Sequence, residues 1–409
     1  MITARSALEL DPDLALVSLD GIGAYDHIFR AAMLERLDEV ENARDLLPFV
    51  LAFYGDVSNY ILEGDNGLIF DILQGEGGEQ GDALMPALFS LRIDRALKEG
   101  IRHLLPGEFA FAFLDDVYLL VKRDRAKEMF DLFTRLIEER AGVKPHLGKT
   151  KAWGSGSSEC PPGLDSIGPN VWKGDKPPVE QGLNMLGSPI GAEAYISSWC
   201  TKQLHRFQLL LHRLQWLPDP QCRWLLLKFC AEPRANHVLR NVSPHLARQL
   251  AERHDSALWE SLLALLDINS APEGEVHHRV ATLPIRHGGG GLRRATRIMW
   301  GAHWAAWADA APFIHNRFPD LWHDISTALT DAMTMLPSFQ SVQDCCLRLD
   351  AAGFARPSWD DLATGARPPL QPRERFPEYE PGVWQHGWQF YACDRLEHQE
   401  KKRGAEPTT

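Results

Sequence analysis

Apolar runs of strand length alternate with helix-like spacing through the first half of the chain. The run at residues 14–19 ends directly before an aspartate and predicts a buried strand. Apolar residues three and four positions apart then predict a helix over residues 28–40. Two further apolar runs, residues 57–62 and 68–73, flank a segment of turn-forming residues and predict a pair of strands. Strands and helices therefore alternate in this region.

A glycine-rich loop and an amphipathic helix continue the pattern. Residues 74–81 contain four glycines, and Asp82 stands where a helix N-cap would stand, ahead of a helix that runs to about Leu97. Apolar spacing also predicts a helix over residues 126–140, which Gly142 would end. Between these helices, the sequence EFAFAFLDDVYLLVKR predicts a hairpin with two aspartates at its tip.

The second half of the chain is predicted to be mostly helical. Helical spacing occurs at residues 195–216, 221–240, 245–266 and 292–310, and no internal repeat is present. Glycine, proline and serine are frequent between residues 154 and 182, which indicates a loop or linker. Prolines and charges after residue 363 indicate a tail that is disordered in part. The predicted divisions are residues 1–153, 154–182, 183–250, 251–362 and 363–409.

Composition excludes several broad classes of protein. Apolar residues make up 44% of the 409 residues and charged residues 24%, as in an ordinary globular protein. The net charge of −12 argues against a protein that coats nucleic acid through bulk positive charge. Residues 1–150 carry 27 acidic and 16 basic side chains, whereas residues 151–250 carry 7 acidic and 11 basic ones. An acidic first part thus precedes a mildly basic middle.

The cysteines and the apolar segments bear on cellular location. The seven cysteines show neither a disulfide framework nor zinc-ligand spacing, so we expect a reducing compartment. No signal sequence is evident, and no apolar run reaches the length of a bilayer span. We therefore expect an intracellular, soluble protein without membrane contact. The choice between nucleus and cytoplasm stays open.

Three aspartates are the strongest candidates for chemistry. Asp115 and Asp116 are flanked by apolar runs that would draw both carboxylates toward a medium of low dielectric, where unpaired charges are unfavourable. Asp20 stands at the end of another apolar strand. If the two strands are neighbours, their carboxylates form the oxygen-rich cluster that Mg²⁺ prefers. Two such ions can promote an in-line phosphoryl displacement, which predicts nucleotidyl transfer.

Four segments in this order resemble the palm of reverse transcriptases, most closely those of non-LTR retrotransposons. They are LDGIGAYD at 19–26, GGEQGDALMPALF at 77–89, FLDD at 113–116 and HLGKTKAW at 146–153. The resemblance implies an α/β (α+β) fold: a polymerase-type palm with an antiparallel sheet and packed helices, followed by a mostly helical C-terminal region. It also implies catalytic and metal-binding roles for Asp20, Asp115 and Asp116, with two Mg²⁺ ions as cofactors and Mn²⁺ as an alternative.

The resemblance assigns four further residues. Tyr25 matches the bulky side chain that closes on C2′ of the incoming sugar and so favours deoxynucleotides. Gln80 and Gly81 match a template and nucleotide contact, and Lys149 matches a catalytic lysine near the triphosphate. Each residue also has a structural interpretation: a core aromatic for Tyr25, a glycine-rich connection for Gln80 and Gly81, and a solvated loop lysine for Lys149.

The implied function is DNA synthesis on an RNA template, with a DNA primer and deoxynucleoside triphosphates as partners. Residues 183–196 resemble the primer-side hairpin that follows the palm, and thumb-like helices would come next. The match departs at the N-terminus, because the family has basic fingers before the palm and Arg5 is the sole basic residue before Asp20. The second motif has Ala83 where proline is usual and Met85 where serine is usual. The resemblance leaves open whether this retroelement fragment is active or inactive alone, and its fingers or endonuclease part would lie on another chain.

Two other segments resemble short motifs of unrelated enzyme classes, and one alternative function stays open. A P-loop NTPase is disfavoured because Gly142 lies one position too far before the GKT at residues 148–150. An α/β-hydrolase is disfavoured because the HGGG at 287–290 has no G-x-S-x-G partner. The alternative that stays open is a catalytically dead remnant that acts as a nucleic-acid-binding or structural protein.

Overall fold

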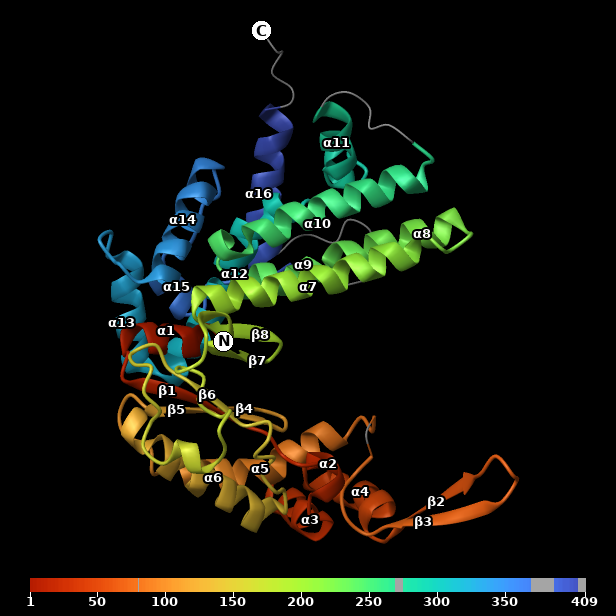
Figure 1. The fold of residues 1–409 in the computed structure, drawn as a ribbon, viewed down its shortest axis with the longest axis vertical. Coiled ribbons are helices and arrows are strands. Elements are labelled where there is room, and N and C mark those ends of the chain that lie inside the picture. Colours follow the sequence, from red (N-terminus) through yellow and green to blue (C-terminus); the bar gives the residue numbers. More distant parts are fainter. Residues whose placement is uncertain (80, 269–274, 369–385, 404–409) are drawn as a thin grey trace. The chain divides into compact units, whose positions relative to one another are not determined.

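A four-stranded antiparallel sheet is the framework of the first half of the chain in the computed structural model (Figure 1). The structure describes residues 1–79, 81–268, 275–368 and 386–403. The strands lie in the order β4–β5–β1–β6, and their bounds are β1 Leu14–Leu19, β4 Phe109–Phe113, β5 Asp116–Lys122 and β6 Lys151–Trp153. The predicted strand at 14–19 and the predicted hairpin are thus confirmed, and they are neighbours.

The chain divides into two compact units. The first, here called the sheet unit, consists of Asp11–Pro177 and Gln181–Leu186. The second, here called the helical unit, consists of Met1–Leu10, Pro178–Glu180 and the chain from Gly187 onward. The two short strands β7 (Gly182–Met185) and β8 (Ser188–Gly191) fall on either side of this division.

Alternation of side chains along the strands gives the sheet two different faces. Ala15, Val17 and Leu19 of β1 belong to one apolar core with Val117 and Leu119 of β5. This core also contains the buried sides of two helices, α5 and α6, so these helices cover that face. Residues 14, 16 and 18 of β1, and residues 118 and 120 of β5, point to the opposite face.

Helices α5 (Met85–Ile101) and α6 (Ala126–Ala141) lie side by side under the sheet (Figure 1). Gly142 ends α6 in the left-handed region, with φ of 79°, which confirms the predicted helix end. The predicted start of α5 was wrong by two residues, because Leu84 and not Asp82 is the N-cap. Asp82 accepts a hydrogen bond from the Leu84 N–H at 2.8 Å and so closes the turn before the helix rather than capping it.

Three short helices and a hairpin lie between β1 and α5. The helices are α2 (Ala24–His27), α3 (Arg30–Glu39) and α4 (Leu47–Tyr54), and the hairpin strands are β2 (Ser58–Glu63) and β3 (Ile69–Gln74). The predicted strand pair is confirmed, with Ser58 opposite Gln74. Its apolar side chains are open to solvent on both faces, and Ile61 is 72% and Leu73 70% exposed. A two-stranded sheet by itself is only marginally stable, so this hairpin is the least supported element of the sheet unit.

The helical unit contains most of the remaining helices. Its α-helices are α1 (Ile2–Leu10), α7 (Glu193–Leu214), α8 (Pro220–Leu226), α9 (Ala235–Asn241), α10 (Pro244–Leu265), α11 (Glu275–Thr282), α12 (Ala295–Arg317), α13 (Pro319–Thr330), α14 (Pro337–Ala351), α15 (Trp359–Ala363) and α16 (Trp388–Arg403). Short 3₁₀ segments of the chain lie at Arg44–Leu46, Arg123–Arg125, Leu164–Ser166, Pro178–Glu180, Glu232–Arg234 and Ile285–His287, and a π-helical turn spans Leu227–Ala231.

Helix α12 is the centre of the helical unit. Its residues 298–308 are all buried, as expected for a helix segment with neighbours all round. Trp304 has no exposed surface and makes edge contacts with Phe354 and Trp388, with ring centroids 5.3 and 5.9 Å apart. The tryptophan-rich sequence of residues 300–307 therefore forms core.

The fold class is confirmed: a small antiparallel sheet with packed helices precedes a mostly helical region. Two predicted elements differ. The helix expected over 221–240 is broken into α8, a π turn, a 3₁₀ turn and α9, since Pro233 cannot donate a backbone hydrogen bond inside a continuous helix. Helix α16 lies within the segment expected to be a tail. None of the helices in the described ranges has the length and apolarity that a membrane crossing requires.

Candidate functional site

The register of the sheet brings Asp20 and Asp116 to the same end of two neighbouring strands. Leu19 of β1 is opposite Val117 of β5, so the next residue of each strand, Asp20 and Asp116, stands across from the other. Both have even numbers and therefore share the face that points away from α5 and α6. Two acids that are 96 positions apart in the sequence thus stand across from each other on paired strands.

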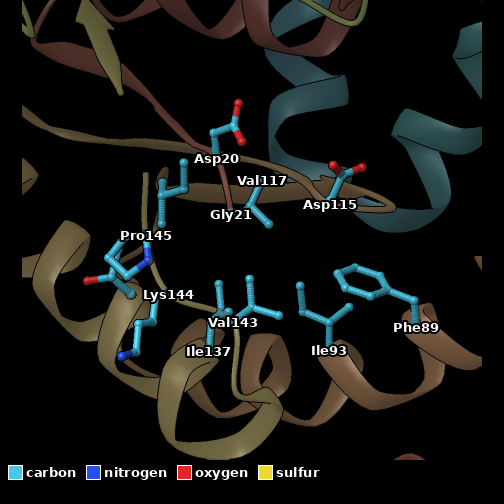
Figure 2. A pocket seen from close by; sticks show the side chains of 12 residues that line it. Asp20, Gly21, Phe89, Ile93, Asp115, Val117, Ile137, Val143, Lys144 and Pro145 are labelled. Carbon is cyan, nitrogen blue, oxygen red and sulfur yellow. The ribbon is translucent and has the colours of Figure 1, made fainter. Parts of the chain in front are cut away.

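Asp115 reaches this place through the hairpin turn. Phe113 of β4 pairs with Asp116 of β5, which leaves Leu114 and Asp115 as the two turn residues. Leu114 has φ of 56°, a left-handed conformation that is unfavourable for a leucine. Figure 2 shows the carboxylates of Asp20 and Asp115 directed to the same side, away from the apolar side chains of Val117 and Ile93. The strained turn therefore serves to point Asp115 toward the other acids.

The three acids influence one another electrostatically. Burial raises the pKa of the Asp116 carboxyl, and the negative charges of Asp115 and Asp20 raise it further. Lys149 opposes this rise. Neither Asp115 nor Asp116 receives a side-chain hydrogen bond or ion pair from the residues that the structure describes. The site thus concentrates negative charge that the protein neutralises only in part.

Lys149 is the cation next to this cluster. Its ammonium nitrogen lies 3.3 Å from a carboxylate oxygen of Asp20, and the two side chains are 59% and 29% exposed. The backbone places it, because the N–H of His146 donates to the carbonyl of Asp20 at 2.7 Å. The segment that carries Lys149 is therefore attached to the end of β1, and the predicted lysine lies beside the predicted acids.

The carboxylates do not converge on one point in this structure. Within the described ranges, the one group of at least three ligand atoms that all lie within 4.8 Å of one another consists of His287, Asp394 and Glu397, in the helical unit. Asp20 is turned toward Lys149, with which it forms an ion pair. The donor set itself, three carboxylates with incomplete neutralisation, suits a hard divalent cation.

The His287 group has protein cations of its own. Arg286 lies 2.6 Å from Asp394 and 3.1 Å from Glu397, and Arg293 lies 2.7 Å from Glu397. The Glu397 side chain has no exposed surface. These two arginines neutralise the acids of this group, so it reads as a structural ion-pair network that ties α16 to the segment before α12.

Tyr25 lies close to the acids on the chain that follows β1. Its ring meets the Phe89 ring edge-on, with centroids 4.9 Å apart, and so contacts the first turns of α5. Burial raises the pKa of the Tyr25 hydroxyl, and the charge of Asp115 adds to the rise. The structure thus brings Tyr25 together with Asp115, as well as with the start of the second motif.

The second motif lies against the Tyr25 segment through its glycines. Gly78 N–H donates to the Tyr25 carbonyl at 2.8 Å, and Gly77 N–H donates to the Ile28 carbonyl at 2.9 Å. A Cβ atom on Gly77, whose φ is 77°, would overlap the backbone of Asp26. Gly81 has φ of 100° and open space around it. Gln80 lies outside the described residues.

A small cavity lies on the helix side of the sheet, below the acids (Figure 2). Its volume is about 20 Å³, and its walls are mainly apolar, with Val117, Ile93 and Phe89 among them. It has room for little more than one water molecule. It is therefore too small to hold a nucleotide.

Arg30, which lies outside the four motifs, connects the glycine-rich loop with the β2–β3 hairpin. Arg30, at the start of α3, is 4% exposed and bonds to the glycine-rich loop and to the base of the β2–β3 hairpin. Its sequence neighbours gave no signal, because its partners lie 26 to 47 positions away. A buried arginine becomes visible only when the fold is known.

Comparison with known proteins gives one sequence relative and several weak structural ones. The chain is 25% identical over 298 residues to the retrotransposable element SLACS 132 kDa protein of Trypanosoma brucei gambiense. The match covers 71% of this chain and 23% of that protein, so the chain spans about a quarter of the length of its relative. No family model matches. The expected resemblance to retrotransposon proteins is confirmed by this relative.

The solved structures that are similar in shape include two telomerases. A telomerase from Candida albicans in complex with a fragment of telomeric RNA has a TM-score of 0.42 and 10% identity, with 84% of this chain and 52% of that chain covered. An apo telomerase from Candida tropicalis has a TM-score of 0.38 and 12% identity, with 78% and 55% covered.

Proposed function

We propose that this chain is the polymerising part of a retroelement reverse transcriptase, which joins deoxynucleotides on an RNA template. The observation that carries the proposal is the placement of Asp20 and the Asp115–Asp116 pair at the same end of the β1–β5 strand pair. Similarity to a retrotransposon protein supports it from a separate direction. Template RNA, DNA primer and deoxynucleoside triphosphates are the partners that this function requires.

Asp20, Asp115 and Asp116 would hold the divalent ions. Two bound Mg²⁺ ions would stabilise the charge that develops on the attacking and leaving oxygens of nucleotidyl transfer. The raised pKa of Asp116, caused by burial and by its two acidic neighbours, agrees with a site that accommodates added positive charge. Its ionised form would be favoured once a cation is bound.

The remaining residues have complementary roles in this proposal. The Tyr25 ring, held edge-on by Phe89, would exclude a 2′-hydroxyl from the sugar position. Gly81 leaves open space for the close approach of a nucleotide or template. The exposed Lys149 would leave Asp20 and bind a phosphate oxygen, where its ammonium can give a proton to the departing pyrophosphate.

Metal binding and primer extension test the proposal together. Isothermal titration with Mg²⁺ and with Mn²⁺ should show binding to the natural chain and loss of at least one site in the double variant Asp115→Asn with Asp116→Asn. Extension of a DNA primer on an RNA template should fall by roughly a thousandfold or more in the same variant, as when charged groups at a reaction centre are removed. Asp124→Asn, which changes an exposed acid nine positions away, is the matched control.

The alternative is a catalytically dead remnant that binds nucleic acid. It predicts that the metal affinity of the double variant equals that of the natural chain and that no primer is extended by either. Unchanged metal affinity would therefore overturn the proposed function, even if RNA is bound.

A further inference from the structure

Arg30 forms an unusual set of bonds for a buried cation. Its Nε donates to the Gly77 carbonyl at 2.7 Å, its Nη1 to the Asp56 carbonyl at 2.7 Å and its Nη2 to the Ser58 hydroxyl at 3.0 Å. Its own backbone N–H donates to the Glu76 carboxylate at 2.7 Å. One side chain thus connects α3, the base of the hairpin and the glycine-rich loop.

The three acceptors of the guanidinium are all uncharged. No carboxylate among the described residues forms an ion pair with the Arg30 side chain. Burying a cation without a carboxylate partner is an unfavourable way to fill space, and an apolar side chain would pack at lower cost. The planar fork of donors, which lysine lacks, is what fits three acceptors in three segments. The arrangement therefore indicates that Arg30 fixes the relative positions of its acceptors rather than filling space.

A second contact extends this geometry to the start of α5. The guanidinium lies over the Tyr54 ring, 5.3 Å from its centroid. The Tyr54 hydroxyl donates to the Asp82 carboxylate, and Asp82 also accepts from the Leu84 N–H just before α5. Arg30 and Tyr54 together hold the glycine-rich loop at both of its ends, Glu76–Gly77 and Asp82.

The other side of this loop is the backbone that carries Tyr25. Gly77 and Gly78 donate to the carbonyls of Ile28 and Tyr25, as described above. Any shift of the loop away from Arg30 must therefore lengthen these bonds or move the backbone of Tyr25. Gly77 also lies directly against the backbone of Asp26, which a Cβ atom at this position would overlap.

We propose that Arg30 is a positioning residue for sugar discrimination, an inference that rests on the proposed function. It fixes residues 76–78 against the backbone of Tyr25 and so sets the space between the Tyr25 ring and this part of the glycine-rich loop. Arg30 does not touch the nucleotide. Its role is to keep the gap narrow enough that a deoxyribose fits and a ribose does not.

Arg30→Lys is the first test, with Arg36→Lys as its matched control. Arg36 lies on the same helix and forms ion pairs with Glu39 and Asp94 at the surface. In Arg30→Lys, hydrogen exchange of the amides at residues 77–82 should become about tenfold faster, which corresponds to the loss of one hydrogen bond with a charged donor. Exchange in the control should equal that of the natural chain.

The second readout is specific to positioning. The ratio of kcat/KM for dATP over ATP should fall by roughly fivefold or more in Arg30→Lys, mainly through a lower KM for ATP, and stay constant in the control. Gly77→Ala changes the residue whose carbonyl accepts from Arg30 and leaves the Arg30 side chain in place, and it should lower the ratio in the same direction. This second variant keeps the test decisive if Arg30→Lys folds poorly.

Two results would overturn the inference. One is unchanged exchange at residues 77–82 in Arg30→Lys, because the loop would then not depend on the guanidinium. The other is faster exchange with an unchanged dATP/ATP ratio in both variants, because Arg30 would then have a structural role alone. Failure of the proposed function has a different signature, because the natural chain would then extend no primer with either nucleotide. In that case the exchange measurement alone shows whether the Arg30 side chain holds the glycine-rich loop.

Discussion

At the scale of single residues, the charge of Asp116 at the start of β5 works against folding. Asp116 is partly buried and lies close to two other carboxylates, and these causes together raise its pKa. A carboxyl whose pKa is higher in the folded state than in the unfolded one destabilises the fold at pH values above that raised pKa. The wild-type residue at this position is therefore kept at the expense of stability, as is common at reaction centres.

Asp116→Asn should for this reason stabilise the metal-free protein. In EDTA at pH 7 we expect Tm to rise by about 2–4 °C, since the amide has no charge to desolvate or to repel. Because the folded-state pKa is the higher one, the wild-type deficit shrinks as pH falls through it, so the difference in Tm should be much smaller near pH 4 and vanish below the unfolded pKa. Differential scanning calorimetry at both pH values checks this. A lower Tm for the variant at pH 7 would contradict the electrostatic account, and Asp124→Asn should change nothing.

The candidate acids could be identified from the sequence because each stands next to an apolar strand run. Asp20 follows residues 14–19 and the Asp115–Asp116 pair interrupts residues 109–122, so the strand ends were visible in advance. What the sequence could not supply is the register, since antiparallel pairing of β1 with β5 depends on which turn and which face the core selects. Arg30 was missed for a related reason: its function depends on acceptors that only the fold brings together.

At the scale of elements, α5 and α6 pack closely against each other and form one core with the sheet. Gly100 of α5 faces Phe133 of α6, and a Cβ atom at residue 100 would lie 2.7 Å from the ring. Phe133 is fully buried, so its ring is packed on all sides. Glycine is therefore required in this helix despite its low helical propensity.

Gly100→Ala should destabilise the sheet unit by about 1–3 kcal/mol, the usual cost of inserting a methyl group into a packed interior. The gain in helical propensity on replacing glycine, roughly 1 kcal/mol, should not offset this. Urea unfolding followed by circular dichroism measures the change. Lys98→Ala, two positions earlier on the solvent side of α5, is the control and should shift the midpoint little. Equal or greater stability of Gly100→Ala would show that the two helices can separate.

Helix boundaries were predicted well where a special residue ends the element. Gly142 marks the end of α6 in both the sequence and the structure, because its positive φ is a local requirement. The break between α8 and α9 was not predicted, although Pro233 lies in it, because the apolar spacing continues across the π turn at Leu227–Ala231. Helix α16 was missed since proline and charge dominate the segment before it.

At the scale of the whole molecule, the charge is distributed in a way that restricts where a polyanion can bind. The net charge of −12 repels nucleic acid at long range, so any affinity must come from a locally basic surface. Helix α7 carries exposed basic side chains at Lys202, Arg206 and Arg213, which share one helical face at spacings of four and seven. Trp216, just beyond the helix, is 78% exposed and offers a ring on which a base can stack.

We expect this face of α7 to supply the salt-sensitive part of nucleic-acid binding. Replacing Lys202, Arg206 and Arg213 together by alanine should reduce the slope of log affinity against log salt by roughly 2–3, because each phosphate contact releases about one counterion. Fluorescence anisotropy with a labelled RNA–DNA duplex between 50 and 300 mM KCl measures the slope. Arg248→Ala with Arg253→Ala on α10 also removes exposed positive charge, but Glu252 stands between these two residues, and the slope should change by less than half as much. If both variants lower the slope equally per charge removed, binding follows total charge, and α7 has no special part in it.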